Sequence, residues 1–452
     1  MNKIEDYLKL DNLSELESNI AARLQQDDSH DRTVFLHGAS TEVTSAFIRA
    51  AWASGWQVAL LRKDSPEEHL KKIREKLGFV VECSALENGD HVVFDLASSK
   101  ILSEWLQGVG LPKVSIYSWS EEESALILFT SGSTGFPKGV CHSIGNIIRS
   151  VLLFVDHFAL VPENSLLCLA PIHSMSGLRS LLIPLATDIK VNMVSDVSFI
   201  ELIDIINNDA PSHVLCGPIF IKMLSAYGRR IADAIVSVKA IFCTGTDIDD
   251  DARLDVQHQF SIPVLNYYGL TETSGIVLAE KPEQQYIGFL PPPCEGVGIS
   301  LVADTEVRSK MYQLVIESPN IFLGYLGDTL KRKSFFNTGD LVTKTENGQL
   351  LLHGRSSGAV KAPSTEFIYP FILEKWLRSH FDSYDFSVSA INIPGGYGFR
   401  VTVDSPSSLD TSVIDRQIGD TLGQDYIPKA WDYATIRRNS LGKIVELTKH
   451  IS

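Results

Sequence analysis

The sequence lacks the features of a secreted or membrane-spanning protein. It has no apolar run long enough to cross a bilayer, and its first twenty residues contain no apolar signal-peptide core. Its six cysteines are scattered without a C-x-x-C pair, which favours reduced, mostly buried thiols over disulfides or a metal site. We therefore expect a cytoplasmic protein with no membrane partner.

Positive charge is also scarce. The chain has 40 lysines and arginines against 55 aspartates and glutamates, for a formal net charge of −15. This balance argues against a nucleic acid or an anionic membrane as the main partner. It leaves an anionic small molecule open, because a cluster of backbone N–H groups binds an anion whatever the net charge of the chain.

The order of hydrophobic patterns predicts an α/β fold of more than one domain. A chain of 452 residues is too long for one compact core, and it contains no internal repeat. Strand-like and helix-like segments alternate twice, which predicts mixed, mainly parallel sheets flanked by helices. The first series covers 32–40, 41–55, 56–63, 65–78 and 91–97, and the second covers 198–210, 213–218, 219–234, 238–246, 249–260 and 263–269.

From about residue 298 the pattern changes to short alternating strands, with an Asn-Gly turn at Asn347 and Gly348. This pattern predicts an antiparallel β-subdomain. The segment GRSSG, residues 354–358, is small and flexible, as expected of a domain boundary. We expect a large N-terminal domain over residues 1–354 and a small, mobile α+β domain over residues 355–452.

The stretch LFTSGSTGFPKGV, residues 128–140, is rich in glycine and hydroxyl residues around one lysine and follows an apolar strand-like segment. Such a turn offers backbone N–H groups and close approach, and Lys138 adds a positive charge, which together suit a polyphosphate. A Walker A loop is excluded because Gly139, rather than Ser or Thr, follows the lysine. A flexible surface loop is the alternative, but the apolar flanks and the Pro-Lys-Gly setting favour phosphate binding.

This loop resembles the signature of the adenylate-forming superfamily of acyl-CoA synthetases, peptide-synthetase adenylation domains and luciferases. Other stretches resemble further motifs of that superfamily in the same order, and together they cover nearly the whole chain. They are YYGLTET (267–273), IESPNIFLGYLGD (316–328), FFNTGDLV (335–342), LLHGR (351–355), YIPKAW (426–431) and RNSLGKIVE (438–446). The part before the loop is shorter than in many members, which predicts a reduced early subdomain.

The resemblance implies an acid–thiol ligase. ATP, with Mg²⁺, would activate a small-molecule carboxylic acid as an acyl adenylate with release of pyrophosphate. A thioester would then form on CoA or on the phosphopantetheine of an acyl carrier protein. Acid and nucleotide are both anionic, so catalysis would depend on positioning and charge neutralisation.

Two alternatives remain open. One is a stand-alone adenylating enzyme that passes the acyl group to an amine or alcohol, and the other is a non-catalytic nucleotide-binding member. The second is disfavoured because Lys138, Glu272, Asp340 and Lys443 are all retained.

The resemblance also implies roles for individual residues. Thr271 would bind the α-phosphate, Glu272 would hold Mg²⁺, and Asp340 would accept both ribose hydroxyls. Arg355 would reach the ribose or phosphate, and Lys443 would bridge the acid carboxylate and the α-phosphate. Further nucleotide contacts would come from Thr130, Ser131, Gly132, Ser133, Thr134, Gly135, Lys138, Gly245, Thr246 and Tyr268. Without the ordered motifs, Asp340 would be interpreted as a turn acid and Lys443 as a solvated lysine of the tail.

The same comparison places the acid pocket among the segments 170–182, 242–248 and 266–275. Its composition suggests an aryl or medium-length acyl acid rather than an amino acid. The candidate wall residues are His173, Ser174, Met175, Gly177, Cys243, Gly245, Thr246, Tyr267, Tyr268, Gly269 and Thr273. Arg179 is a candidate partner for a second carboxylate, although a helical arginine more often lies on the surface.

Most departures from the superfamily pattern affect residues of the second step, in which the thioester forms. Ser357 and Gly358 occupy positions that usually hold charged hinge residues, and KAPSTEF (361–367) replaces a glycine-rich turn. Leu441 departs within the terminal motif, and Ser174 stands where a histidine is usual. The adenylation residues are retained, so the choice among CoA, a carrier protein and another acceptor stays open.

The retained lysine gives a first test. Lys443→Ala should severely reduce the adenylation step while leaving ATP affinity largely intact, because the lysine would act between the acid and the α-phosphate. Carboxylate-dependent exchange of labelled pyrophosphate into ATP measures the first quantity, and ATP titration the second. Unchanged exchange in the variant would remove Lys443 from the mechanism.

Overall fold

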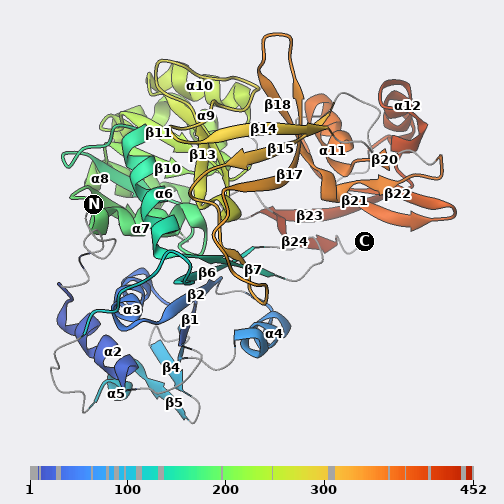
Figure 1. The fold of residues 1–452 in the computed structure, drawn as a ribbon. Coiled ribbons are helices and arrows are strands. Elements are labelled where there is room, and N and C mark those ends of the chain that lie inside the picture. Colours follow the sequence, from blue (N-terminus) through green and yellow to red (C-terminus); the bar gives the residue numbers. More distant parts are fainter. Residues whose placement is uncertain are drawn as a thin grey trace.

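The structure is a computed structural model, and Figure 1 shows three arrangements of sheet and helix along the chain. One sheet lies at the bottom of that view, a second sheet with its helices at the upper left, and the later strands at the upper centre and right. The residues that the structure describes are 9, 12–26, 32–62, 65–77, 81–85, 91–95, 98–107, 115–130, 137–194, 197–246, 248–303, 311–364, 367–381, 383–405, 409–438 and 444–449.

The first sheet has eight strands in the order β16-β7-β6-β2-β1-β3-β4-β5. It is parallel only across β6-β2-β1-β3, and the strands on both sides of this centre pair antiparallel. Its strands are β1 (Thr33–His37), β2 (Gln57–Leu61), β3 (Val81–Ala85), β4 (His91–Asp95), β5 (Ser98–Ile101), β6 (Leu126–Thr130), β7 (Lys138–His142) and β16 (Gly324–Tyr325). The nearby helices are α2 (Glu15–Gln25), α3 (Thr41–Ser54), α4 (Glu67–Leu77) and α5 (Leu102–Trp105).

The sequence pattern predicted β1, β2, α3 and α4, but it missed β3. The predicted strand 91–97 is β4, and it runs antiparallel to β3 instead of extending a parallel sheet. β3 escaped prediction although VECSA alternates apolar and polar side chains, because it is only five residues long and Glu82 and Ala85 are poor strand formers.

The second sheet has six strands in the order β13-β12-β11-β10-β8-β9 and is parallel except at β13. Its strands are β8 (Ser165–Cys168), β9 (Lys190–Met193), β10 (His213–Cys216), β11 (Ala240–Cys243), β12 (Val264–Leu270) and β13 (Gly275–Ala279). Two helices cover one face, namely α6 (Ile144–His157) and α7 (Met175–Ala186). The other face is covered by α8 (Phe199–Asp209), α9 (Pro218–Tyr227), the 3-10 segment η1 (Gly228–Ile235) and α10 (Asp250–Phe260).

Side chains alternate across this second sheet, as strand geometry requires. Phe242 and Tyr267 pack in the core beneath α6 and α7, whereas Cys243 and Val264 pack in the core beneath α8 to α10. This two-sided burial explains why the central strands β10 and β11 are apolar. The predicted architecture of mixed sheets flanked by helices is confirmed, with parallel strands forming most of the second sheet and the centre of the first.

The later part of the chain forms the predicted β-subdomain and a small α+β unit. The subdomain contains β14 (Gly298–Ala303), β15 (Tyr312–Glu317), β17 (Phe335–Lys344) and β18 (Leu350–Arg355), all antiparallel. The small unit contains η3 (Ser356–Gly358), β19 (Val360–Lys361), β20 (Phe367–Ile368), α11 (Pro370–His380), β21 (Asp385–Ile393), β22 (Gly396–Asp404), α12 (Thr411–Thr421), η4 (Gln424–Tyr426), β23 (Ala430–Arg438) and β24 (Ile444–Lys449). Residues from 360 onward pack into a core of their own, while the boundary at residue 354 stays a prediction.

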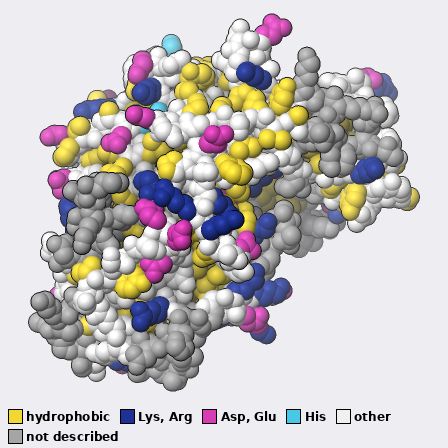
Figure 2. All heavy atoms as spheres, viewed as in Figure 1, with side chains coloured by type: hydrophobic (Ala, Val, Ile, Leu, Met, Phe, Trp, Pro, Cys, Tyr) yellow, Lys and Arg dark blue, Asp and Glu magenta, His cyan; other side chains and the backbone are white. Residues whose placement is uncertain are grey.

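The expectation of reduced, buried cysteines is confirmed. All six cysteines are free and buried. Within the described ranges, no helix is both long enough and apolar enough to cross a membrane. On the face drawn in Figure 2, basic side chains near the centre lie next to acidic ones, so the charge there is mixed.

One buried carboxylate fixes the end of the second sheet. Glu280, directly after β13, accepts hydrogen bonds from the backbone N–H of Asn266 at 2.7 Å and of Tyr286 at 2.6 Å. Its third partner is Arg253 of α10, and both side chains are fully buried. Helix α10 and strands β12 and β13 are therefore held together at one point.

This buried pair gives a test of stability. Glu280→Gln leaves the Arg253 charge buried without an anion, so the free energy of unfolding should fall by about 3–5 kcal/mol. Denaturant titration measures the change, with Glu317→Gln, an exposed carboxylate on β15, as the matched control. Equal stability of the two variants would show that Glu280 does not anchor the sheet.

Candidate active site

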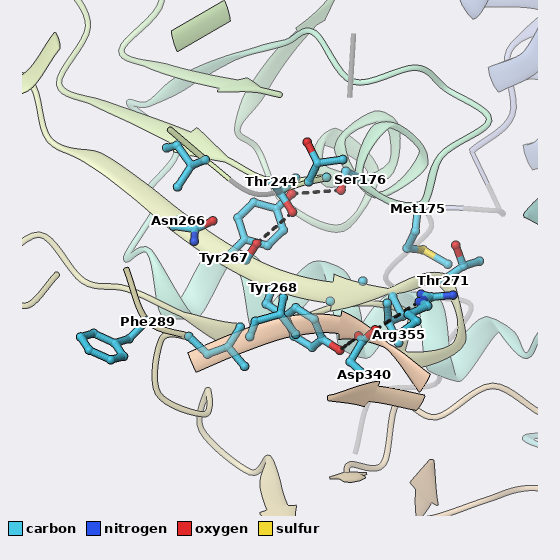
Figure 3. Close-up of a pocket in the computed structure, with 18 of the residues that line it drawn as sticks. Met175, Ser176, Thr244, Asn266, Tyr267, Tyr268, Thr271, Phe289, Asp340 and Arg355 are labelled. Atoms are coloured by element: carbon cyan, nitrogen blue, oxygen red, sulfur yellow. Dashed lines mark hydrogen bonds and ion pairs between the residues drawn. The ribbon is translucent and has the colours of Figure 1, made fainter. Parts of the chain in front are cut away.

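A cavity of about 590 Å³ opens where the second sheet meets the β-subdomain. Its walls come from the start of α7, the ends of β11 and β12, the 3-10 turn η2 (Thr271–Thr273), β17, β18 and Lys375 of α11. Figure 3 shows the central side chains of this cavity. The carboxyl ends of parallel strands commonly carry ligand sites in α/β folds.

At one end of the cavity, Asp340 is held between an aromatic hydroxyl and a guanidinium. Tyr268 donates its hydroxyl to Oδ2 at 2.5 Å, and Arg355 donates Nε to Oδ1 at 3.2 Å. Asp340 and Arg355 lie opposite each other in the β17–β18 register, which explains their contact. The Asp340 side chain is nearly buried, and it still faces the cavity.

Burial and neighbouring charges shift the pKa values of Asp340 and Tyr268. Desolvation raises the pKa of Asp340, while the charge of Arg355 and the hydrogen bond from Tyr268 act to lower it. The pKa of Tyr268 is raised well above its usual value by its own burial and by the adjacent carboxylate. The nearly buried Asp340 carboxyl group, whose pKa is raised, thus faces the cavity beside the half-exposed guanidinium of Arg355.

Glu272 and Thr271 lie at another part of the wall, on the η2 turn. Tyr325 of β16 donates its hydroxyl to Glu272 Oε1 at 3.1 Å. Burial, followed by the Glu272 charge, raises the pKa of Tyr325. Lys138 of β7 lies 5.4 Å from the centre of the Tyr325 ring, because β16 pairs with β7. Lys138 and Glu272, which were predicted from two separate motifs, therefore both contact Tyr325.

The predicted phosphate loop is only partly described. Thr130, at the end of β6, lines the cavity, and Lys138 begins β7. Ser131, Gly132, Ser133, Thr134 and Gly135 lie outside the described residues, as does Lys443. Their roles stay predictions.

The predicted acid side also lines the cavity in part. Ser174 caps α7, where its hydroxyl accepts the Gly177 N–H at 3.1 Å, and Met175 is the first residue of that helix. Tyr267 donates its hydroxyl to Ser176 at 3.0 Å. Figure 3 shows Tyr267 and Tyr268 pointing to opposite sides of β12, toward Ser176 and toward Asp340 respectively. Gly245, Thr246 and Gly269 complete the predicted residues on this wall.

Gly269 has a steric reason to be glycine. A Cβ there would lie 1.8 Å from the Gly275 carbonyl oxygen, at the point where the β12–β13 register shifts. Only a residue without a side chain lets β13 approach β12 so closely.

The other predicted pocket residues lie away from this wall. His173 lines a separate cavity with Phe199 and Phe220, and Cys243 is buried on the opposite face of the sheet. Gly177 packs against backbone, since a Cβ there would lie 2.1 Å from a carbonyl oxygen of residue 171. The Thr273 hydroxyl accepts a hydrogen bond from the backbone N–H of Leu270 at 2.9 Å, and Thr273 is fully buried.

Arg179 differs from the surface position usual for a helical arginine. It is fully buried, and its Nη2 donates to the Tyr267 hydroxyl at 2.8 Å. Its place on α7 brings it behind the acid side of the cavity. The expectation of a surface residue is wrong, because α7 turns this position toward β12 and α6.

Sequence reasoning missed several wall residues. Ser176 and Thr244 are adjacent in sequence to residues that were predicted to line the pocket, so the same motifs could have identified them. Phe289 and Lys375 come from a loop and from α11, and only the tertiary fold brings them to the cavity. No short motif marks either of them.

The sequence is similar to a known enzyme family and to individual members of it. The model of the family described as AMP-binding enzyme matches residues 12–326. A 2-succinylbenzoate–CoA ligase of Staphylococcus aureus is 23% identical over 261 residues, which are 57% of this chain and 52% of the relative. The chain thus spans about half the length of the curated relatives it matches.

Solved structures show the same fold over nearly the whole chain. The O-succinylbenzoate coenzyme A synthetase of Bacillus subtilis in complex with AMP has a TM-score of 0.79 and 18% identity, with 96% of this chain and 93% of that chain covered. ATP-bound MatB of Rhodopseudomonas palustris has a TM-score of 0.77 and 17% identity, with 98% and 97% covered. The family match extends over more than half of the sequence, and the chain belongs to the AMP-binding enzyme family.

Proposed function

We propose that this chain uses ATP to activate a carboxylic acid as an acyl adenylate, with release of pyrophosphate, and then forms a thioester on CoA. The observation that carries the proposal is the single cavity with Asp340 at one part of its wall, Glu272 and Thr271 at another, and the Ser174–Tyr267 side beside them. An adenylating enzyme needs these elements together, because acid and α-phosphate must meet in one site.

The nucleotide would lie along β12 and β17. Asp340, in its ionised form, has two oxygens that can accept the ribose hydroxyls, and the Tyr268 hydroxyl already directs one of them. Gly245 and Thr246 border the adenine side, and Thr271 and Thr130 border the phosphates. These assignments rest on the position of each residue on the cavity wall and on the family match.

The residues present fit a magnesium ion. Glu272 places a carboxylate at the wall near Thr130 and Thr271, and Mg²⁺ is commonly held by one or two carboxylates together with substrate phosphates. When bound there, the ion would neutralise charge on the phosphates. Glu272 itself stays oriented by the Tyr325 hydroxyl.

The acid would occupy the side formed by Ser174, Met175 and Tyr267. The Met175 side chain and the Tyr267 ring on this side favour an aryl or medium-length acyl acid. CoA as the acceptor is supported by the names of the curated relatives, which are CoA ligases. Pro363 stands in the turn that differs from the superfamily pattern, so an acyl carrier protein, an amine or an alcohol is kept as an outcome of the test.

Pyrophosphate exchange tests the activation step. Labelled pyrophosphate should enter ATP only when a suitable acid from a panel of aryl and acyl acids is present, since only the acyl adenylate reverses to ATP. The same acid with CoA should then give a thioester. No exchange with any acid would indicate a non-catalytic nucleotide-binding protein. Exchange without a thioester would assign another acceptor.

The pKa of Asp340 gives a test of nucleotide binding. Its raised pKa means that the ionised form, which accepts the ribose hydroxyls, is lost at a higher pH than for an ordinary aspartate as the pH falls. ATP affinity should therefore decline on acidification, with the midpoint above the usual aspartate range.

Arg355→Met should move this midpoint to still higher pH, because Arg355 acts to lower the pKa of Asp340. Titration of ATP across pH measures the midpoint, and Arg416→Met, an exposed arginine on α12, is the control. Identical midpoints in all three proteins would contradict the role given to Asp340.

A further inference from the structure

Arg179 carries a buried charge that the protein does not neutralise. Its side chain is fully buried, and no carboxylate in the described part of the chain pairs with it. Arg253 is equally buried, but Glu280 neutralises it. Both arginines leave Nε and Nη1 without a hydrogen-bond partner, so the missing anion is what distinguishes Arg179.

The contacts that Arg179 does make compensate its charge only in part. Its Cζ lies 4.3 Å from the centre of the Phe154 ring and 5.3 Å from that of Tyr267. Aromatic faces attract a cation, but less strongly than a carboxylate in a low dielectric. Its one hydrogen bond goes to the neutral Tyr267 hydroxyl at 2.8 Å. A buried cation in this state is costly unless an anion completes it.

The unpaired donors lie directly behind the acid side of the cavity. A Cβ built on Gly275 would lie 2.8 Å from Arg179 Nη1 and 3.1 Å from Met175 Cγ, and both Gly275 and Met175 line the cavity. A glycine leaves this wall thin, and Gly275 has a φ of 93°, which disfavours any other residue. Met175 is an unbranched, flexible side chain, which can rotate to give a ligand access.

We propose that Arg179 forms an anion-binding subsite at the far end of the acid pocket, and that the preferred substrate is a carboxylic acid with a second carboxylate. One carboxylate would be activated at the α-phosphate, and the other would pair with Nη1 of Arg179 once Met175 moves aside. This inference rests on the proposed acid activation and specifies its substrate class.

A charge-assisted hydrogen bond from the buried Arg179 would select diacids over monoacids. An acid with one carboxylate would leave Arg179 unpaired, whereas a diacid would place an anion on the free Nη1 and neutralise the buried charge. Discrimination by a buried polar group is strong for this reason, since the wrong substrate leaves that group unsatisfied. Tyr267 then acts as a positioning residue, because its hydroxyl holds Nη2 and so directs the other donors.

The test compares acids of the same length with one or two carboxylates. The pairs are butanoate and succinate, pentanoate and glutarate, hexanoate and adipate, and benzoate with its three ring dicarboxylates. In the intact protein, at least one diacid should exceed its partner about tenfold or more in kcat/KM for pyrophosphate exchange. Arg179→Met, which removes the charge and leaves an unbranched side chain, should abolish the preference.

Arg179→Lys is the matched control, because it keeps the charge and should retain part of the preference. It also keeps the test valid if Arg179→Met does not fold. Equal use of mono- and diacids by the wild-type protein, or a preference that survives in Arg179→Met, would overturn the proposal. Either result would leave Arg179 as a packing residue held by Phe154 and Tyr267.

A direct binding measurement separates this inference from the proposed function. Calorimetric titration of each diacid and its monoacid partner into the protein with saturating AMP needs no turnover. Diacid binding that depends on Arg179, without pyrophosphate exchange, would uphold the subsite and reject the activation chemistry. Exchange that proceeds with equal binding of both acids would uphold the chemistry and reject the subsite.

Discussion

The hydrogen bonds to Glu280 fix the strand on which the cavity depends. This carboxylate is buried, and it accepts from Arg253 and from two backbone N–H groups, of which one is that of Asn266. Asn266 precedes the two tyrosines of β12 that face the cavity. Because an unsatisfied carboxylate in the interior would be very costly, the register of β12 against β13 and α10 is strongly determined. The positions of Tyr267 and Tyr268 follow from that register.

Much of the fold was predictable because its signals are local. Alternating strand and helix patterns located β1, β2, α3, α4 and, beside the second sheet, α8, α9 and α10, and the Asn-Gly turn located the β17–β18 hairpin. The ordered motifs also identified residues that the fold brings together, such as Asp340 and Arg355. Such residues are recognisable in sequence because the close contacts they make require particular residue types at fixed spacing.

The rest was not predictable because it depends on which face an element presents. Cys243 and Phe242 are neighbours in β11, yet they pack on opposite sides of the sheet, and periodicity alone does not say which side meets the cavity. Arg179 looked like a surface residue because a buried, unpaired cation is rare. Lys375 reaches the cavity from a separate unit of the chain, which no local pattern encodes.

The opposite orientation of the two adjacent tyrosines in β12 has a consequence for substitutions in that strand. One side chain borders the region assigned to the acid and the other the region assigned to the nucleotide, with the strand backbone between them. A substitution at position 267 would change the side next to Ser176, whereas the contact between Tyr268 and Asp340 lies across the strand. The backbone of β12 therefore separates the two regions, so the residues of one can change without contacting the other.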